Sequence, residues 1–343
     1  MKAIVYDEFG PPEVLHLAKR PNPVPKDNEV LVRVYATPVN YGDLIARNFK
    51  NVSASQFNMP LPLLLPTRFY FGFSKPKVNI LGSEFSGVIE ATGKEVTRFK
   101  PGDQVYGYLG QRMGAYAEYL CMAETGSLAL KPANLTHEQA AAVPYGVIMA
   151  TSLLRRGNIQ PGHKVLVNGA SGGIGSAAVQ LARHYGAEVT GVCGAPRMEF
   201  VKALGADHVI DYTREDFTRN GQTYDLIFDV LGKRSFPQVR GSLKPDGVYL
   251  LASFKTRHLL QMLQTKMAGS QKVICALASE KPEDLEFVRE LVEAGQFKSI
   301  VDRVYPMEQA AEAHRYVESG SRQGAVVITV GKDANFSEKL ASL

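Results

Sequence analysis

A glycine-rich turn between a strand and a helix constrains this sequence more than any other feature. The apolar run 164–167 predicts a buried strand, and a helical pattern follows at 174–185. Between them, residues 168–175 read Asn-Gly-Ala-Ser-Gly-Gly-Ile-Gly. Glycines let a backbone approach a pyrophosphate closely, and the free N–H groups at a helix start stabilise its negative charge. The turn therefore predicts a dinucleotide-binding unit rather than a plain strand-to-helix connection.

The chain has two parts with different sequence patterns, and its length of 343 residues favours two domains. Residues 1–126 read as short β-rich pieces between Gly and Pro, such as 29–34, where apolar and polar residues alternate. From about residue 136, strands alternate with helices, which predicts a doubly wound parallel sheet. The predicted strands are 164–167, 188–192, 208–210, 225–229, 247–251 and 325–330, and the predicted helices are 174–185, 198–204, 282–294 and 307–317.

Composition excludes several classes of protein. The net charge is +5, but no run of like charges suited to nucleic acid occurs. Three widely spaced cysteines do not make a disulfide framework, which favours a reducing compartment. No apolar stretch is long enough for a signal peptide or a membrane span. We therefore expect a cytoplasmic protein with no nucleic-acid partner and no transmembrane segment.

The residues after the second strand of the dinucleotide-binding unit indicate which cofactor it takes. NAD-specific sites usually carry a carboxylate about 20 residues past the glycine turn. No Asp or Glu occurs at 189–198 here, and the strand runs into Gly194 and Arg197. Arg197 is able to pair with a 2′-phosphate, which favours NADPH. The alternative is that Arg197 is a solvated residue at a helix start.

Several short motifs extend the pattern over the whole chain. They are Gln-Leu-Ala at 180–182, Leu-Gly-Ala-Asp at 204–207, Val-Ile-Asp-Tyr at 209–212, Val-Asn-Tyr-Gly-Asp at 39–43, Pro-Gly-Asp-Gln-Val at 101–105 and Gly-Ala-Tyr-Ala-Glu-Tyr at 114–119. Together with the glycine turn, they resemble the medium-chain dehydrogenase/reductase superfamily, and most of all its quinone oxidoreductase branch. The resemblance covers residues 1–331.

This resemblance implies an α/β fold with two domains and a homodimer. A GroES-like β-barrel catalytic domain is expected over 1–126, completed by 279–343, and a Rossmann doubly wound parallel sheet over 127–278. The reaction is expected in a cleft between the domains, with Asn40 beside the nicotinamide and Tyr41 on the same segment. The predicted cofactor-binding residues are Asn40, Ser171, Gly172, Gly173, Ile174, Gly194, Arg197 and Tyr212.

Zinc ligands are missing from the positions where zinc-dependent members of the resembled family carry them. Those relatives have Cys near Val39 or Asn40, His at Ser83 and a four-cysteine loop after the region of Gly107. The His and Cys residues of this chain also include no two within five positions. Without a Lewis acid, the substrate must accept hydride readily, which favours quinones and α,β-unsaturated carbonyls (enones).

The catalytic assignments leave alternatives open. Tyr41 is able to donate a proton or a hydrogen bond to a developing oxyanion, but a tyrosine after a strand more often packs. Ile45 and Ile148 depart from the aromatic residue and the threonine that relatives often carry. A short-chain dehydrogenase is disfavoured, because no Tyr-x-x-x-Lys pair occurs. A catalytically weak NADPH-binding scaffold or redox sensor is the alternative function.

The apolar segment 57–78 is longer than the minimal family pattern. It contains Leu-Pro-Leu-Leu-Leu-Pro at 61–66 and Phe-Tyr-Phe-Gly-Phe at 69–73. Three interpretations stay open: a wall of a large apolar substrate pocket, a surface that docks on a membrane or a partner, and a loop packed on the protein's own core.

Overall fold

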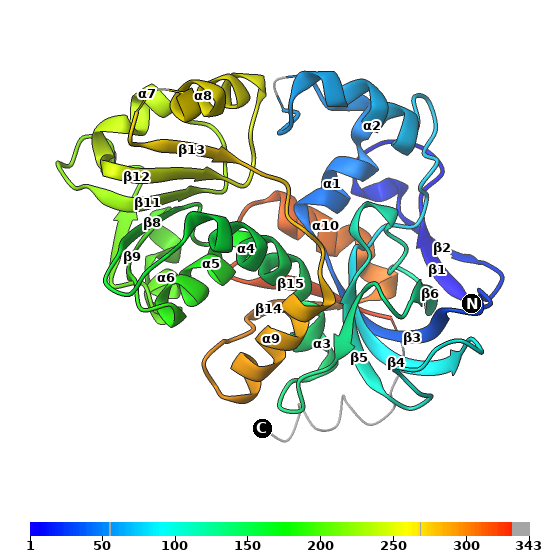
Figure 1. The fold of residues 1–343 in the computed structure, drawn as a ribbon. Helices are drawn as coiled ribbons and strands as arrows, with labels where there is room; N and C mark the ends of the chain where they lie inside the picture. The colour runs from blue at the N-terminus through cyan, green and yellow to red at the C-terminus, as the bar shows by residue number, and fades with distance from the viewer. Residues whose placement is uncertain (55, 268, 331–343) are drawn as a thin grey trace. The chain divides into compact units, whose positions relative to one another are not determined.

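The computed structural model describes residues 1–54, 56–267 and 269–330. Contacts divide the chain into two compact units, drawn together in Figure 1. Unit 1 contains Met1–Asn48, Ser74–Ala142 and the chain from Val301 onward, and unit 2 contains Phe49–Phe73 and Val143–Ile300.

The first unit is built mainly from antiparallel strands. Its elements are β1 (Lys2–Val5), β2 (His16–Lys19), β3 (Glu29–Pro38), α1 (Tyr41–Arg47), β4 (Glu84–Thr92), β5 (Gln104–Tyr108), β6 (Tyr119–Ala123), β7 (Ser127–Leu130), α3 (His137–Ala141), β14 (Val301–Pro306), α10 (Ala310–Glu318) and β15 (Ala325–Thr329). The larger sheet has the order β14-β15-β3-β4-β5-β7, with β6 also paired to β3. Val30, Val32 and Val34 are fully buried, as the alternation along β3 predicts.

The C-terminal strand completes this sheet, as the resemblance implies. β15 runs antiparallel to β3, with Ile328 opposite Thr37, and β14 pairs parallel to β15. The fold is therefore the GroES-like arrangement that the sequence predicts. The last thirteen residues of the predicted completing segment, 331–343, lie outside the described residues.

The second unit contains a parallel six-stranded sheet. Its elements are α2 (Leu64–Phe71), α4 (Pro144–Gly157), β8 (Lys164–Asn168), α5 (Gly173–His184), β9 (Glu188–Cys193), α6 (Met198–Ala203), β10 (His208–Asp211), β11 (Tyr224–Asp229), α7 (Phe236–Val239), β12 (Leu243–Leu251), α8 (Thr256–Met267), β13 (Lys272–Cys275) and α9 (Pro282–Glu293). The strand order is β10-β9-β8-β11-β12-β13, and every pair is parallel. This is the doubly wound Rossmann order, and it reverses direction between β8 and β11.

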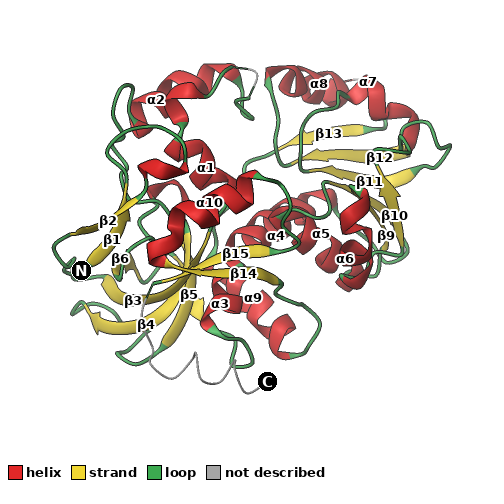
Figure 2. Cartoon of the chain, turned by 180° about the vertical axis from the view of Figure 1, so that it is seen from behind, coloured by secondary structure: helices red, strands yellow, loops and turns green. Residues whose placement is uncertain are grey.

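Helices cover both faces of the parallel sheet. Figure 2 shows α4, α5 and α6 on one side and α7 and α8 on the other. Val165, Leu166 and Val167 of β8 are consequently fully buried. A Cβ at Gly146 would lie 2.5 Å from the backbone oxygen of Gly173, so this glycine lets α4 approach the start of α5. No helix among the described residues is long and apolar enough to cross a membrane.

The unit boundaries differ from the predicted domain limits. The chain passes between the units at 142/143 and 300/301 rather than at 126/127 and 278/279. The reason is packing that composition does not reveal: α3 contacts β3 and β4, and α9 contacts α4. Residues 49–73 also group with the second unit, although we expected them in the barrel domain.

Candidate functional site: the carboxyl edge of the parallel sheet

The loops that carry most of the predicted cofactor residues leave the same edge of the parallel sheet. They follow the carboxyl ends of β8, β9, β10 and β11, whose registers place these ends next to one another. In open α/β sheets, ligands bind outside the carboxyl ends of the strands, where the strand order reverses. Here that point lies between β8 and β11, directly beside the glycine turn.

The glycine turn is closed tightly against its own backbone. Gly169 has φ +91°, which favours glycine, and its carbonyl accepts from the N–H of Gly172 at 3.2 Å. A Cβ at Gly175 would lie only 2.1 Å from the oxygen of Gly169, so position 175 has no room for a side chain. By contrast, a Cβ at Gly173 would meet no atom within 4 Å. Open space therefore lies over the first turn of α5.

The residues at the start of α5 fit a pyrophosphate. Gly173 is exposed, whereas Ser171, Gly172 and Ile174 are half-buried beside it. The first N–H groups of a helix have no intrahelical acceptor and carry a positive partial charge. A side chain at position 173 would project into the space where an anion has to approach these groups. Free N–H groups beside open space are what the pyrophosphate of a dinucleotide requires.

Asp229 fixes the ends of three neighbouring strands. Its side chain is 1% exposed, and its Oδ1 accepts from Nδ2 of Asn168 at 3.0 Å. The same oxygen accepts from the N–H groups of Leu231 at 3.0 Å and Gly232 at 3.2 Å. Oδ2 accepts from the hydroxyl of Tyr249 on β12 at 2.7 Å. Asp229 thus ties the loop after β11 to the residue that begins the glycine turn.

The predicted adenosine-end residues also come together. The N–H of Tyr212 donates to the carbonyl of Cys193 at 3.1 Å, which joins the ends of β10 and β9. The ring of Tyr212 would lie 3.5 Å from a Cβ at Gly194, and 64% of this residue is exposed. Arg197 stands at the start of α6, where its N–H donates to the carbonyl of Gly194 at 2.9 Å. Gly194, Arg197 and Tyr212 therefore line one loop cluster.

A carboxylate that sequence reasoning missed lies beside this cluster. Asp211 ends β10 opposite Cys193, and its Oδ1 accepts from the N–H of Thr213 at 3.0 Å. This hydrogen bond lowers the pKa of Asp211, with contributions from the hydroxyl of Thr213 and the charge of Arg214. A carboxylate was expected only at the end of β9, the strand after the glycine turn. In a parallel sheet the next strand, β10, ends at the same edge.

In the first unit, Asn40 is held at the beginning of α1. Its Nδ2 donates to Glu84, which is 2% exposed. Its N–H donates to Oδ2 of Asp43 at 2.8 Å, and Oδ1 of Asp43 accepts from the N–H of Gly82 at 2.9 Å. Burial raises the pKa of Asp43 to about 6 despite these two donors. Glu84 therefore orients the side-chain amide of Asn40, and Asp43 holds its backbone.

The far end of α1 is anchored by a buried polar cluster. Arg47 is 1% exposed, ion-pairs with Glu318, and lies 2.8 Å from Nδ1 of His314 through its NH1 atom. Nε2 of His314 lies 2.9 Å from the hydroxyl of Tyr116. Since His314 is completely buried, desolvation lowers its pKa, as does the charge of Arg47. These contacts tie α1 to α10 and fix the segment that carries Asn40.

The remaining residues of the catalytic hypothesis have different surroundings. Tyr41 is 53% exposed, so it does not belong to the core that the packing alternative required. Ile148 is fully buried inside α4, and Ile45 is half-buried on α1. Among the described residues, no group of three or more His, Cys, Asp or Glu side chains is arranged to hold a metal ion.

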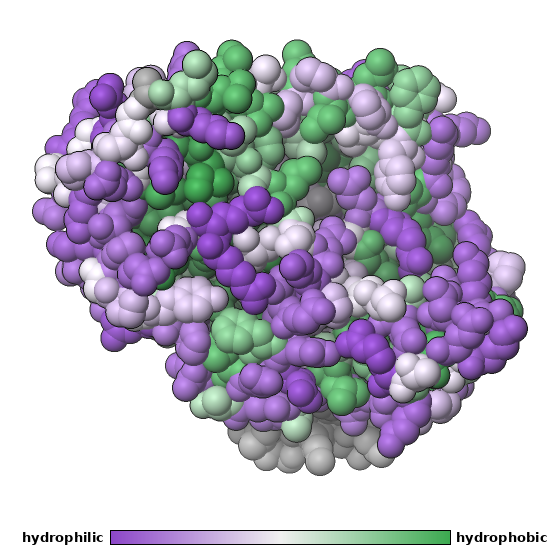
Figure 3. Space-filling view, in the orientation of Figure 1, coloured by the Kyte–Doolittle hydropathy of each residue, from purple (hydrophilic) through white to green (hydrophobic). Residues whose placement is uncertain are grey.

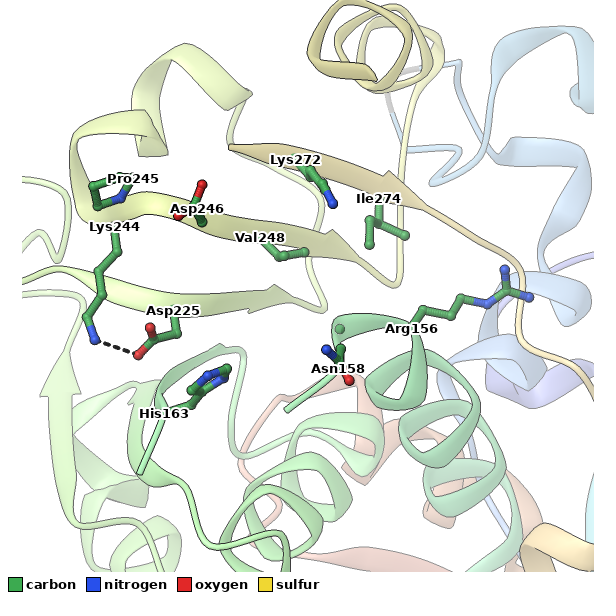
Figure 4. A pocket seen from close by; sticks show the side chains of 11 residues that line it. Arg156, Asn158, His163, Asp225, Lys244, Pro245, Asp246, Val248, Lys272 and Ile274 are labelled. Carbon is green, nitrogen blue, oxygen red and sulfur yellow. Dashed lines mark hydrogen bonds and ion pairs between the residues drawn. The ribbon is translucent and has the colours of Figure 1, made fainter. Parts of the chain in front are cut away.

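A pocket of about 460 Å³ lies at the opposite, amino edge of the parallel sheet (Figure 4). Lys244 and Asp225 form an ion pair at 2.7 Å on one side of it, and Asn158 ends α4 on the other. The strands begin at this edge, whereas the glycine turn follows their ends. The pocket is therefore separate from the candidate dinucleotide site.

Comparisons with known proteins agree with this architecture. Residues 26–133 match the family described as "Alcohol dehydrogenase GroES-like domain", and residues 204–328 match the family described as "Zinc-binding dehydrogenase". The mitochondrial NAD(P)H oxidoreductase RTN4IP1 of Mus musculus is 31% identical over 96% of this chain and 89% of its own. The chain belongs to the medium-chain dehydrogenase/reductase superfamily.

Other members place the chain in the quinone oxidoreductase-like branch of the superfamily. The quinone oxidoreductase structure from Coxiella burnetii has a TM-score of 0.81 and 28% identity, and the match covers 96% of this chain and 99% of that one. The chloroplastic NADPH-dependent alkenal/one oxidoreductase of Arabidopsis thaliana is 29% identical over 96% of this chain and 79% of its own. Superfamily membership supports an oxidoreductase that uses a nicotinamide cofactor.

Proposed function

We propose that this member of the superfamily is an NADPH-dependent, zinc-independent reductase of quinones or α,β-unsaturated carbonyls. The observation that carries the proposal is the open space over Gly173 at the start of α5, beside the point where the strand order reverses. The names of the Coxiella and Arabidopsis relatives support the two substrate classes. When bound, the reduced nicotinamide supplies a hydride.

The chain's own residues have separate parts in this proposal. The backbone of Ser171, Gly172, Gly173 and Ile174 holds the pyrophosphate, and Tyr212 lines the adenosine end. Asn40, oriented by Glu84 and Asp43, positions the substrate and the nicotinamide. Tyr41 hydrogen-bonds to the oxyanion that develops as the substrate is reduced. Reduction of a conjugated electrophile needs no metal ion, because the negative charge that develops on the substrate is spread over several atoms.

In this proposal, Arg197 supplies the positive charge that favours the 2′-phosphate of NADPH. Asp211 lies in the same loops, and its negative charge opposes that phosphate. Thr213 and Arg214 already engage the carboxylate of Asp211. Arg197→Ala should therefore lower the ratio of NADPH to NADH affinity about 10- to 100-fold, the usual effect of losing one charge-assisted pair. Calorimetric titration with both cofactors measures this ratio. Lys202→Ala removes a charge from the same helix, where Lys202 pairs with Glu199, and should leave the ratio unchanged.

The substrate class is tested by NADPH oxidation across quinones, enals and enones, with simple ketones and alcohols as controls. We expect turnover with the conjugated substrates only, in the presence and absence of a chelator. Asn40→Ala and Tyr41→Phe should lower kcat more than they weaken NADPH binding. Unchanged turnover in both variants would remove these residues from the reaction. Chelator-sensitive oxidation of simple alcohols would contradict the proposal.

The second candidate function is an NADPH-binding scaffold or redox sensor with little turnover. It is favoured by Tyr41, which is 53% exposed and has no hydrogen bond to another described residue that marks it as a general acid. Tight NADPH binding without turnover on any substrate of the panel would select this function. A homodimer and a cytoplasmic location remain predictions, to be checked by sedimentation and by cell fractionation.

A further inference from the structure

The apolar segment 61–73 forms an exposed surface of the second unit. Within these thirteen residues, six large apolar side chains are between 39% and 58% exposed: Leu61, Leu63, Leu65, Phe69, Tyr70 and Phe73. Figure 3 shows apolar residues at the surface over α2, the helix that carries three of the six. So many exposed apolar side chains on one short segment indicate a surface that binds another molecule.

The segment is nevertheless anchored to the protein. Phe71 is 7% exposed, and its ring centroid lies 5.3 Å from that of Phe49, which is 1% exposed. The NH2 atom of Arg68 donates to the carbonyl of Val52 at 3.4 Å. One side of α2 is therefore held by internal contacts while the leucines and aromatic residues face outward. The segment therefore has both a packed side, as the loop interpretation expected, and an exposed apolar side.

The charged residues next to this segment in the sequence all have one sign. From residue 44 to residue 83 the chain contains Arg47, Lys50, Arg68, Lys75 and Lys77, but neither Asp nor Glu. The whole chain has 34 acidic residues in 343, so a stretch of this length would ordinarily hold about four. Lys50, Lys75 and Lys77 are exposed, whereas Arg47 is buried against Glu318. In the sequence, the apolar segment is therefore flanked by positively charged residues and by no acidic ones.

The chemistry of the segment favours a lipid occupant over a protein. Residues 60–66 read Pro-Leu-Pro-Leu-Leu-Leu-Pro, without one side-chain hydrogen-bond donor or acceptor, and the three prolines lack an N–H. Protein interfaces usually carry a hydrogen bond for every 100–200 Å² of buried area, whereas the acyl region of a bilayer offers none. A second copy is disfavoured as well, because a symmetric contact would bring like charges together.

We propose that residues 61–73 dock on the surface of a bilayer that contains anionic lipids. The leucines and aromatic side chains enter the boundary between headgroups and acyl chains, and the lysines contact the phosphates. α2 has eight residues and is too short to span a bilayer, so the contact is peripheral. The inference goes beyond the proposed function, since it concerns where the protein binds and not what it reduces.

Co-sedimentation of the full chain with vesicles tests this surface. We expect binding to vesicles of phosphatidylcholine with phosphatidylglycerol to exceed binding to phosphatidylcholine alone by at least about tenfold, and to weaken as salt is added. Leu65→Ser with Phe69→Ser should abolish the binding. Lys50→Gln with Lys75→Gln should remove the preference for anionic vesicles. Because all four side chains are exposed, circular dichroism should show an unchanged fold.

A matched control comes from α8 of the same unit. Leu260 and Leu263 are 58% and 54% exposed, like Leu65 and Phe69, so Leu260→Ser with Leu263→Ser removes a similar apolar area elsewhere. This variant should bind vesicles as the original protein does. An equal loss in both double variants would overturn the assignment to residues 61–73. No binding to anionic vesicles, or dissociation of an oligomer by Leu65→Ser with Phe69→Ser in lipid-free solution, would also overturn it. None of these readouts depends on NADPH oxidation.

Discussion

Gly173→Val should abolish NADPH binding while the protein stays folded. A Cβ at this position meets no protein atom within 4 Å, so the side chain costs the fold little. The added methyl groups occupy the space over the first turn of α5, where a pyrophosphate has to approach the free N–H groups. We expect the dissociation constant for NADPH to rise at least about 100-fold and the unfolding free energy to change by less than about 1 kcal/mol. Calorimetry and urea denaturation measure the two quantities.

Two other glycines of the same unit serve as controls. A Cβ at Gly241 also meets nothing within 4 Å, but Gly241 precedes β12 at the other edge of the sheet, so Gly241→Val should keep the original NADPH affinity. Gly175→Ala should instead destabilise the protein by about 2–4 kcal/mol, because the new Cβ would lie 2.1 Å from the oxygen of Gly169. Normal NADPH affinity in folded Gly173→Val would show that the cofactor binds elsewhere.

Asp229→Ala should cause the largest loss of stability. It removes the acceptor for the Asn168 amide and two backbone N–H groups at a site where Asp229 is 1% exposed. It also removes one of the two acceptors of the Tyr249 hydroxyl, the other being the carbonyl of Arg234. Buried donors without acceptors are costly, and we expect the unfolding free energy to fall by about 3–5 kcal/mol. Urea denaturation measures this change.

Tyr249→Phe is the matched control for that prediction. It removes one donor and leaves Asp229 with the other three, so the unfolding free energy should fall by only about 1–2 kcal/mol. The hydroxyl is largely buried, and burial, with the charge of Asp229, raises the pKa of Tyr249, so it stays protonated as a donor. A loss in Asp229→Ala no larger than in Tyr249→Phe would mean that Asp229 does not organise the three strand ends.

The parts of this structure that sequence analysis predicts depend on local pattern. The glycine turn is recognisable because its conformation requires glycine at 169 and 175, where a side chain would be strained or would clash. The strands of the parallel sheet are recognisable because burial on both faces demands continuous apolar runs, as in 164–167. The grouping of Gly194, Arg197 and Tyr212 follows from the order of neighbouring parallel strands.

The features that sequence analysis missed depend on tertiary contacts. The sequence around Asp229 does not indicate that four donors converge on its carboxylate, since Tyr249 and Asn168 lie on other strands. Asp211 was overlooked for the same reason. α2 is not evident from the sequence, because Pro60, Pro62 and Pro66 interrupt the apolar run, yet proline is compatible with the first turn of a helix. The unit boundaries depend on the contacts of α3 with β3 and β4 and of α9 with α4.

The pairing of β15 with β3 determines the order in which the chain acquires its structure during synthesis. Val327 lies opposite Pro38, so the two strands meet only after residues 325–329 have been synthesised. The parallel sheet, by contrast, lies wholly within the continuous stretch 164–275 and is complete earlier. Until β15 arrives, residues 36–38 of β3 lack their partner strand, whereas β6 pairs with residues 29–33. A short open edge of this kind favours pairing with another chain while folding is incomplete. The parallel sheet is therefore complete before the β-rich unit.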